Sequence, residues 1–514
     1  MTFTALLLSV ALGGQPDAWP AFLGQGASAV DPQTIPLTWS PTENIAWSTK
    51  LPGKGQSSPV IWGDKVFVTA IDGTMKDRCH ILALNLNDGA IAWKHTFDSA
   101  QTVRSNYFQS RSAPTPAVDA QAVYAFFETG NLVALSHAGE VQWQRVLTED
   151  YGPFESTIGL ASSLLAAADM VVVLVDHEGP SYLLAVDKKT GETRWKSDRD
   201  SRVSYASPAL VPVGDQQQIV CSSAGSVDGY DPATGELLWS YSESIGGNRS
   251  ATPLPLGDGR FVIAASPGMH NENESEARQS NGVMSVEKTA DGFAAKVLWR
   301  TEEAMPAFNS PCVYAGMAYW VNRAGVVFCF DAATGSKQYA KRIGQGCWST
   351  PVGLGDRVYI FGKDGLTTVL KTGAEFEVLA ENQLWDPEKV GAEWLARQRA
   401  AGGDSVGHRD HKAPSNKPTP VVPEGQTPAA NPGAAANASP GAPKPSASEA
   451  GGSSSDRPAG GGRPAMTPAD EQRMREQGDN RFADPVQYGV ALVNGSLVIR
   501  TGEVVYCVRQ QIAK

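Results

Sequence analysis

The sequence has few charged side chains and, beyond its first residues, no long apolar run. Asp, Glu, Lys and Arg make up 19% of the 514 residues, and 54 acidic residues against 43 basic ones give a net charge of −11. An acidic surface does not attract nucleic acid or anionic lipid, so we expect neither as the main partner. No later segment reaches the ~20 apolar residues that a transmembrane helix needs.

Motifs for metal, haem and common catalytic chemistry are also missing. The six cysteines stand apart, so there is no C-x-x-C, no C-x-x-C-H haem site and no adjacent Cys pair. Cys329 and Cys507 lie in matching strand contexts, which favours small buried side chains, although one or two disulfides stay open in an oxidising compartment. With seven histidines and no H-E-x-x-H, no metal site is predicted. G-x-S-x-G and Walker A motifs are absent as well.

The first residues have the pattern of an export signal. Phe3 to Leu12 is an apolar run too short to cross a bilayer, and Gly13-Gly14-Gln15-Pro16 follows it. We therefore predict a cleaved signal peptide over residues 1–14 and an exported protein of the periplasm or cell envelope. The alternative is a frayed apolar N-terminus or a misassigned start.

Glycine and tryptophan, by contrast, are plentiful and recur together. The chain has 52 Gly and 13 Trp, and one unit repeats along it: a small-Pro step, two apolar strands, a Gly turn and an aromatic residue. In five copies the aromatic follows the turn glycine by four residues: Gly89/Trp93, Gly139/Trp143, Gly191/Trp195, Gly235/Trp239 and Gly335/Tyr339.

This constant offset has a physical explanation. The glycine supplies the positive φ that a short hairpin loop needs, and Asp187, Asp231 and Asp331 are placed to accept hydrogen bonds from turn amides. Because side chains alternate along a strand, an aromatic at a fixed offset always points the same way. We predict that a series of eight aromatics docks each sheet on its neighbour: Trp47, Trp93, Trp143, Trp195, Trp239, Trp299, Tyr339 and Phe376.

The repeat predicts an all-β fold, an eight-bladed β-propeller of four-stranded antiparallel blades. The small-Pro or equivalent steps also number eight, at Ser58-Pro59, Ala113-Pro114, Ser162-Ser163, Ser207-Pro208, Thr252-Pro253, Ser310-Pro311, Thr350-Pro351 and Asp484-Pro485. The last unit lacks its aromatic strand, and Trp47 has no strands before it. We therefore predict that Asn44–Ser48 completes the last blade and closes the ring, which removes exposed sheet edges.

One stretch interrupts the repeat. Residues 15–385 hold the closing strand and seven blades, and residues 481–514 hold the last blade. Residues 386–480 between them include a segment composed mostly of Pro, Ala, Gly and Ser, which cannot offset its ordering entropy. We predict a largely disordered insertion there, either a tolerated linker or a partner-binding tether.

Several motifs resemble a known family. Trp19-Pro20-Ala21-Phe22-Leu23-Gly24, the small-Pro steps and the Asp-x-x-Thr-Gly-x-x-x-Trp turns are similar to exported PQQ-binding-like β-propeller repeat proteins of the quinoprotein alcohol dehydrogenase-like superfamily, which includes BamB-like scaffolds. Asp176-His177-Glu178-Gly179 is also typical of this group. The resemblance covers most of residues 17–385 and 482–510. It implies the fold, and it leaves the activity undecided because many members bind no cofactor.

The resemblance allows the enzyme hypothesis to be tested on the residues. PQQ dehydrogenases of this superfamily carry an adjacent Cys pair beside the cofactor, a carboxylate and amide cluster for Ca²⁺ and an Asp base. The Cys pair is absent, and neither the cluster nor the base is assignable. We therefore predict no catalytic residue, no metal and no cofactor, with PQQ and Ca²⁺ left unsupported.

Three functions remain after this test. The first is a non-catalytic, monomeric scaffold for proteins of the cell envelope. The alternatives are a PQQ-dependent alcohol or sugar dehydrogenase and a small-ligand-binding propeller.

Any ligand site is expected at the channel mouth, where the innermost strands begin. Loops next to the small-Pro steps supply polar and aromatic side chains that could bind a small polar ligand or an acidic peptide end. The alternative is a hydrated, salt-bridged rim. The candidates are Arg104, Arg111, Glu155, Asp176, His177, Glu178, Tyr205, Arg249, His270, Asn309 and Trp348.

Overall fold

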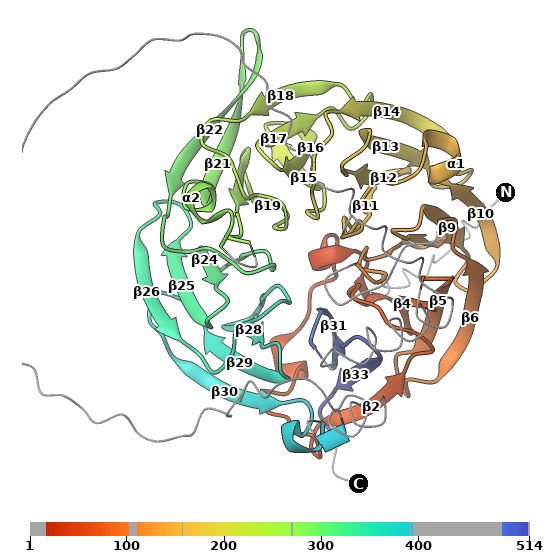
Figure 1. Ribbon diagram of the computed structural model, residues 1–514. Helices are drawn as coiled ribbons and strands as arrows, with labels where there is room; N and C mark the ends of the chain where they lie inside the picture. The colour runs from red at the N-terminus through yellow and green to blue at the C-terminus, as the bar shows by residue number, and fades with distance from the viewer. Residues whose placement is uncertain are drawn as a thin grey trace, which may run out of the picture.

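The predicted propeller is confirmed. The computed structural model describes residues 17–73, 75–101, 110–156, 158–268, 271–390, 392–393 and 486–511. Within these residues eight antiparallel sheets stand as blades around a central axis (Figure 1). The predicted signal peptide and most of the predicted insertion lie outside the described residues. No helix in the described part of the chain is long and apolar enough to span a membrane.

Each of the first seven blades is a meander whose first strand lies nearest the axis. Blades 1 to 4 are formed by β3 (Val60–Trp62), β4 (Lys65–Asp72), β5 (Arg78–Asn85) and β6 (Ile91–Asp98); β7 (Ala117–Val118), β8 (Val123–Phe126), β9 (Asn131–Leu135) and β10 (Val141–Val146); β11 (Leu165–Ala167), β12 (Met170–Val175), β13 (Ser181–Asp187) and β14 (Thr193–Arg199); β15 (Ala209–Val213), β16 (Gln216–Ser223), β17 (Ser226–Tyr230) and β18 (Leu237–Tyr241).

Blades 5 to 8 continue the ring. They are formed by β19 (Leu254–Gly257), β20 (Arg260–Ile263), β21 (Gly282–Thr289) and β22 (Gly292–Arg300); β23 (Cys312–Tyr314), β24 (Met317–Val321), β25 (Val326–Asp331) and β26 (Lys337–Arg342); β27 (Val352–Leu354), β28 (Arg357–Phe361), β29 (Leu366–Lys371) and β30 (Val378–Gln383); β31 (Gly489–Val493), β32 (Ser496–Arg500), β33 (Val504–Val508) and β2 (Ile45–Lys50). The short helices α1 (Leu147–Tyr151), α2 (Glu274–Ala277), η1 (Phe22–Gly24) and η2 (Pro32–Thr34) lie in connections.

The two middle strands of each blade are buried on both faces, which explains their continuous apolar runs. Every residue of β12 is buried, whereas β6 in the outermost position has no fully buried residue. The apolar side chains form clusters between neighbouring blades, so each blade is stabilised by the next one. All six cysteines are buried free thiols, and burial raises the pKa of the Cys79 and Cys221 thiols to about 12.

The ring closes as predicted, by pairing of the two chain ends. Strand β2 pairs antiparallel with β33, and Trp47 lies opposite Cys507. One feature differs from the prediction: β1 (Ala18–Trp19) pairs with β3 and gives the first blade a fifth strand.

The outermost aromatics contact the turn glycines of the following blade. The Trp195 ring lies against Gly235, where an added Cβ would approach within 2.4 Å of it, and the Trp195 Nε1 donates to the Pro232 carbonyl at 2.9 Å. The rings of Trp47, Trp93, Trp143 and Trp299 contact Gly89, Gly139, Gly191 and Gly335 in the same way, and each indole donates to a backbone carbonyl of the next blade.

Three members of the aromatic series depart from this pattern. Tyr339 contacts no turn glycine, because nothing lies within 4 Å of a Cβ added at Gly373 of the next blade. The Trp239 Nε1 donates to Gln218 of its own blade, although its ring stacks on Phe261 of the next blade at 6.3 Å. The docking position of blade 7 is Ala380, not Phe376. Ala380 pairs with Val369 beside the same register shift that places the other aromatics, and Phe376 lies in the preceding turn. The Phe376 ring instead contacts Tyr339 of blade 6 at 5.4 Å.

The small-Pro steps form a hydroxyl belt around the axis. In each of six junctions the backbone N–H of one step donates to the Ser or Thr hydroxyl of the next at 2.9–3.1 Å. The belt residues are Ser58, Thr115, Ser163, Ser207, Thr252, Ser310 and Thr350.

The belt corrects one of the predicted steps. In blade 2 the step is Thr115-Pro116 rather than Ala113-Pro114. Two small-Pro pairs follow one another in this sequence, and the second of them carries the belt hydroxyl. The predicted Asp484-Pro485 lies outside the described residues. Hairpin register places Gly489 at the belt position of blade 8, four residues before Val493, just as Thr350 stands four before Leu354.

An N-terminal arm, residues 17–44, spans the closing blades. Its amide at Asp31 donates to Asn494 of blade 8 at 2.9 Å, and its amide at Trp39 donates to Asn382 of blade 7 at 3.0 Å. The Trp39 ring stacks on Tyr359 at 6.4 Å. The arm therefore joins blades 7, 8 and 1 at the place where Ala380 and Gly489 break the repeat.

Candidate functional site

The channel contains a central cavity of about 420 Å³ at the ends of the innermost strands. Its wall includes five belt residues. It also includes, for each of the seven belt residues, the residue two positions earlier in the sequence. Those earlier positions are Gln56, Ala113, Ala161, Tyr205, Ser250, Phe308 and Trp348. The repeat thus places one residue from each of blades 1 to 7 in the cavity wall, and the type of that residue sets the local chemistry.

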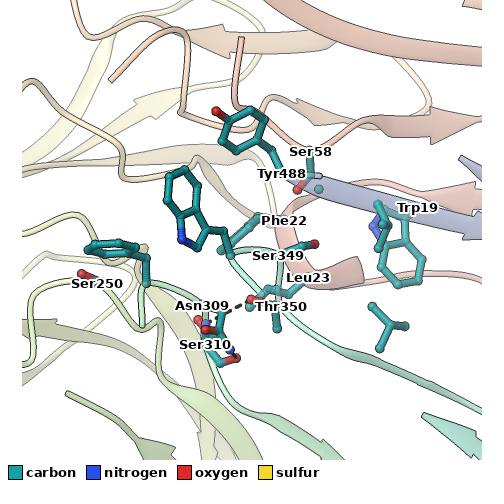
Figure 2. A pocket seen from close by; sticks show the side chains of 15 residues that line it. Trp19, Phe22, Leu23, Ser58, Ser250, Asn309, Ser310, Ser349, Thr350 and Tyr488 are labelled. Carbon is teal, nitrogen blue, oxygen red and sulfur yellow. Dashed lines mark hydrogen bonds between the residues drawn. The ribbon is translucent and has the colours of Figure 1, made fainter. Parts of the chain in front are cut away.

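One side of the cavity is aromatic. The Trp348 ring lies 5.8 Å from Phe308 and 6.2 Å from Tyr488, and the Lys363 ammonium lies 4.7 Å from the Trp348 centroid. Phe22 from η1 completes this side of the wall. Figure 2 shows Phe22 and Tyr488 beside a smaller adjoining pocket near the belt residues Ser310 and Thr350. The aromatic side offers flat apolar contact with one cation behind it.

The opposite side is polar and is carried by blades 4 and 5. The backbone amides of Tyr205 and Ala206 donate to the Arg249 carbonyl, which fixes the two loops together. Burial and, to a smaller extent, the nearby Glu178 charge raise the pKa of Tyr205 to about 12, although the Arg249 charge acts to lower it. The Tyr205 hydroxyl is therefore a neutral hydrogen-bond donor at physiological pH, beside the exposed Arg249 side chain.

The structure brings Tyr205, Arg249 and Trp348 together on the central cavity, with Asn309 in the adjoining pocket. It places Arg111 elsewhere, in a niche between blades 8 and 1. Arg104 and His270 lie outside the described residues.

The Asp176-His177-Glu178 group does not reach the cavity wall. Asp176 is buried and pairs within blade 3 with Arg199, whose Nε lies 2.9 Å from the carboxylate. Ser223 of blade 4 donates to Asp176 and accepts from Arg199, so it links the pair to the next blade. The His177 Nδ1 accepts the backbone amides of Glu155 and Gly179 at 3.1 and 3.0 Å, which anchors the loop. The side chains of Glu155 and Glu178 are exposed. These residues hold the loops of blade 3 in place.

Sequence reasoning missed Phe22, Phe308, Tyr488 and Glu272. The offset of two residues before each belt residue would have identified Phe308, as it identifies Tyr205 and Trp348. Phe22 belongs to the N-terminal arm, and Glu272 belongs to the loop before α2. No repeat spacing points to either residue.

The cavity wall does not fit the Ca²⁺-dependent cofactor of the dehydrogenases. Ca²⁺ takes six to eight oxygen ligands, commonly from several carboxylates. Among its described residues the wall has one carboxylate, Glu272, and no group of three His, Cys, Asp or Glu side chains that could hold a metal occurs in the described ranges.

Comparisons with known proteins agree on the class. The family model described as outer membrane protein assembly factor BamB matches residues 37–159 and 152–341, which is more than half of the chain. The chain therefore belongs to this PQQ-like β-propeller family.

Two curated relatives match at low identity. The outer membrane protein assembly factor BamB of Alkalilimnicola ehrlichii is 24% identical over 220 residues, 41% of this chain and 49% of the relative. The polyvinylalcohol dehydrogenase of a Pseudomonas species is 23% identical over 359 residues, 49% of this chain and 54% of the relative. The chain spans about half the length of these relatives.

Among solved structures, BamB from Moraxella catarrhalis matches with a TM-score of 0.50 and 11% identity, covering 91% of this chain and 98% of that one. At this identity the likeness concerns the fold alone.

Proposed function

We propose that this chain is an exported, non-catalytic scaffold that binds other proteins at the cell envelope. The observation that carries the proposal is the match of more than half the chain to the family described as outer membrane protein assembly factor BamB. A curated relative of that name supports the envelope location. The monomeric state is part of the same proposal.

The outer rim supports the proposal with a repeated apolar feature. Five aliphatic side chains of the outermost strands are between 41% and 52% exposed. Four of them open their strands at the same register, opposite the last or next-to-last residue of the third strand. We call this set the rim aliphatics: Ile91, Val141, Leu237, Leu298 and Val378. Exposed apolar side chains at a repeated position are suited to contact with a protein partner.

The experiment is affinity capture from a solubilised envelope extract with matched variants. Ile91→Lys/Val141→Lys removes two rim aliphatics and adds two charges. Ala92→Lys/Gln142→Lys adds the same charges at the neighbouring exposed positions. We expect the first variant to capture at least five-fold less protein than the wild type, and the second variant to capture the same amount as the wild type. Equal capture by both variants would contradict the rim as the binding surface, and no specific capture by the wild type would contradict the scaffold.

The central cavity supports a second candidate function, binding of a small polar-aromatic ligand. The cavity volume lies in the range of ligand pockets. Trp348 lies on its aromatic side, and Tyr205 and Arg249 lie on the opposite, polar side. Added PQQ and Ca²⁺ test the dehydrogenase version, which the 23% identical polyvinylalcohol dehydrogenase favours. A rise in Tm together with alcohol-dependent dye reduction would support that version over the scaffold.

A further inference from the structure

A niche separate from the central cavity contains an arginine whose buried Nε has no hydrogen-bond partner among the described residues. The niche, of about 270 Å³, lies between the end of β2, the β4–β5 turn and the loop before β33. Arg111 lines it and is 4% exposed, and its Nε has no hydrogen-bond partner. No ion pair or hydrogen bond of its guanidinium occurs in the part of the chain that the structure describes. Burying an unpaired guanidinium costs free energy, because the charge loses its hydration. A bound anion would offset this cost.

The backbone of Arg111 is held firmly from both neighbouring blades. Its N–H donates to the Gln56 Oε1 at 3.0 Å, and its carbonyl accepts the Gln56 N–H at 3.0 Å. The next residue, Ser112, has a φ of 49° and donates its N–H to both Glu128 oxygens at 2.8 and 3.1 Å. A non-glycine residue keeps such a φ only where the surroundings impose it.

A buried ion pair supplies that constraint. The Lys76 Nζ lies 3.2 Å from Glu128, with both side chains fully buried, and it also donates to the Ser110 carbonyl. Residues on both sides of Arg111 are therefore fixed by one charged network. In this network Lys76 and Glu128 neutralise each other, and the Arg111 guanidinium takes no part in it.

The remaining charges of the niche indicate which anion fits. Lys50 and Lys54 each lie 4.0 Å from Glu503, and Lys50 is mostly solvated with 78% of its side chain exposed. Asp72 is bound by Arg78 at 2.8 Å and faces His80 at 3.3 Å. Once these groups are matched, the buried positive charge that remains is that of Arg111. One planar guanidinium suits one carboxylate, held through two parallel N–H···O bonds.

We propose that the niche is a carboxylate-binding site anchored by Arg111, with Lys54 beside it. The carboxylate comes from a small organic acid or from the C-terminus of a peptide, since both present the same group. Binding at this site is measured on the isolated protein and stands apart from the scaffold role.

The test measures Tm and Kd for sodium acetate at constant ionic strength set by chloride. We expect acetate to raise the wild-type Tm in a saturable way and to bind Arg111→Met at least ten-fold more weakly. Arg342→Met removes an exposed arginine at the end of β26 and should match the wild type. Without acetate, Arg111→Met should melt at or above the wild-type Tm, because it breaks no hydrogen bond of the side chain.

Further measurements identify the source of the carboxylate and control for a variant that does not fold. A tetrapeptide with a free C-terminus that binds ten-fold tighter than acetate, while its amide does not bind, assigns a peptide end; equal binding of peptide and acetate assigns a small acid. Arg111→Lys keeps the charge and should bind acetate with intermediate affinity. Acetate binding unchanged in Arg111→Met, no saturable effect on the wild type, or inorganic phosphate bound in preference to acetate would each overturn the proposal.

Discussion

The junctions within the repeat and the junction that closes the ring are built differently. From blade 1 to blade 7 each junction has a belt hydrogen bond, and most have an aromatic seated on a turn glycine. At the closing blades Gly489 replaces the belt hydroxyl and Ala380 replaces the aromatic. The N-terminal arm takes over there, with the Trp39 ring stacked on Tyr359.

The difference follows from the connectivity of blade 8. Its two outer strands, β33 and β2, come from opposite ends of the chain, so no turn joins them. An aromatic on blade 7 therefore has no turn glycine to contact. A repeat can specify a junction only where both halves of the contact belong to the repeat, and the closing junction needs residues of its own.

The largest effect is expected from removing the arm's aromatic. Trp39→Ala should lower the free energy of unfolding by about 3–5 kcal/mol, because a side chain that is 3% exposed leaves a cavity. Trp195→Ala at a regular junction should cost a similar amount, and urea unfolding measures both. A loss below about 1 kcal/mol for Trp39→Ala would show that the arm does not replace a docking aromatic.

The next effect concerns the turn glycines. Gly235→Ala should destabilise by about 2–4 kcal/mol, because φ is +74° and the new Cβ meets the Trp195 ring. Gly214→Ala is the matched control: its φ is +61° with nothing within 4 Å, so only the backbone cost of about 1–2 kcal/mol applies. Thermal unfolding of the two variants separates ring contact from backbone strain, and equal losses would argue against the contact.

The hydroxyl belt should give a smaller effect. Thr252→Val removes the acceptor of the Ser207 N–H, and a buried unsatisfied amide costs about 1–3 kcal/mol. Gly489→Ser adds a hydroxyl at the closing blade, yet its Cβ would lie 2.2 Å from the Ser58 Oγ. Chemical denaturation should show both variants destabilised, and a stabilised Gly489→Ser would mean that the belt can be completed.

The smallest effect is a pH dependence at the hairpin turns. Hydrogen bonds from Arg194, then from the Thr190 and Lys189 amides, lower the Asp187 pKa from 3.8 to about 2. The folded-state pKa is depressed, so this stabilisation is present above pH 3.8 and is lost as the pH falls through about 2. Asp187→Asn should be less stable than the wild type at pH 7, and the difference should vanish near pH 2. A pH-independent difference would contradict the charge-based cause.

The fold was predictable because the repeat carries it. The Gly-to-aromatic offset and the small-Pro steps specified the blades and the strand closure through Trp47, and the predicted Asp turns are confirmed, since Asp187, Asp231 and Asp331 each accept two turn amides. The errors fall where the pattern is ambiguous, as at the tandem prolines of blade 2. The prediction of Phe376 as a docking aromatic was wrong. It follows a turn glycine, but not by the four residues that separate glycine and aromatic in the regular copies.

The site was predictable only in part. Tyr205 and Trp348 reach the cavity because they stand at a fixed distance from the belt. Asp176 looked equivalent in the sequence, but a buried partner 23 residues later in the same blade, Arg199, pairs with it. Pairings of this kind depend on which charges meet after folding, and no spacing in the sequence records them.

The pairing of β2 with β33 also constrains how the molecule is made. Residue 45 emerges during synthesis long before its partner at position 508. Until β33 is made, β2 has no strand to pair with and blade 8 is incomplete. Premature termination before Val504 would leave an open ring, because β2 would then have no strand to pair with.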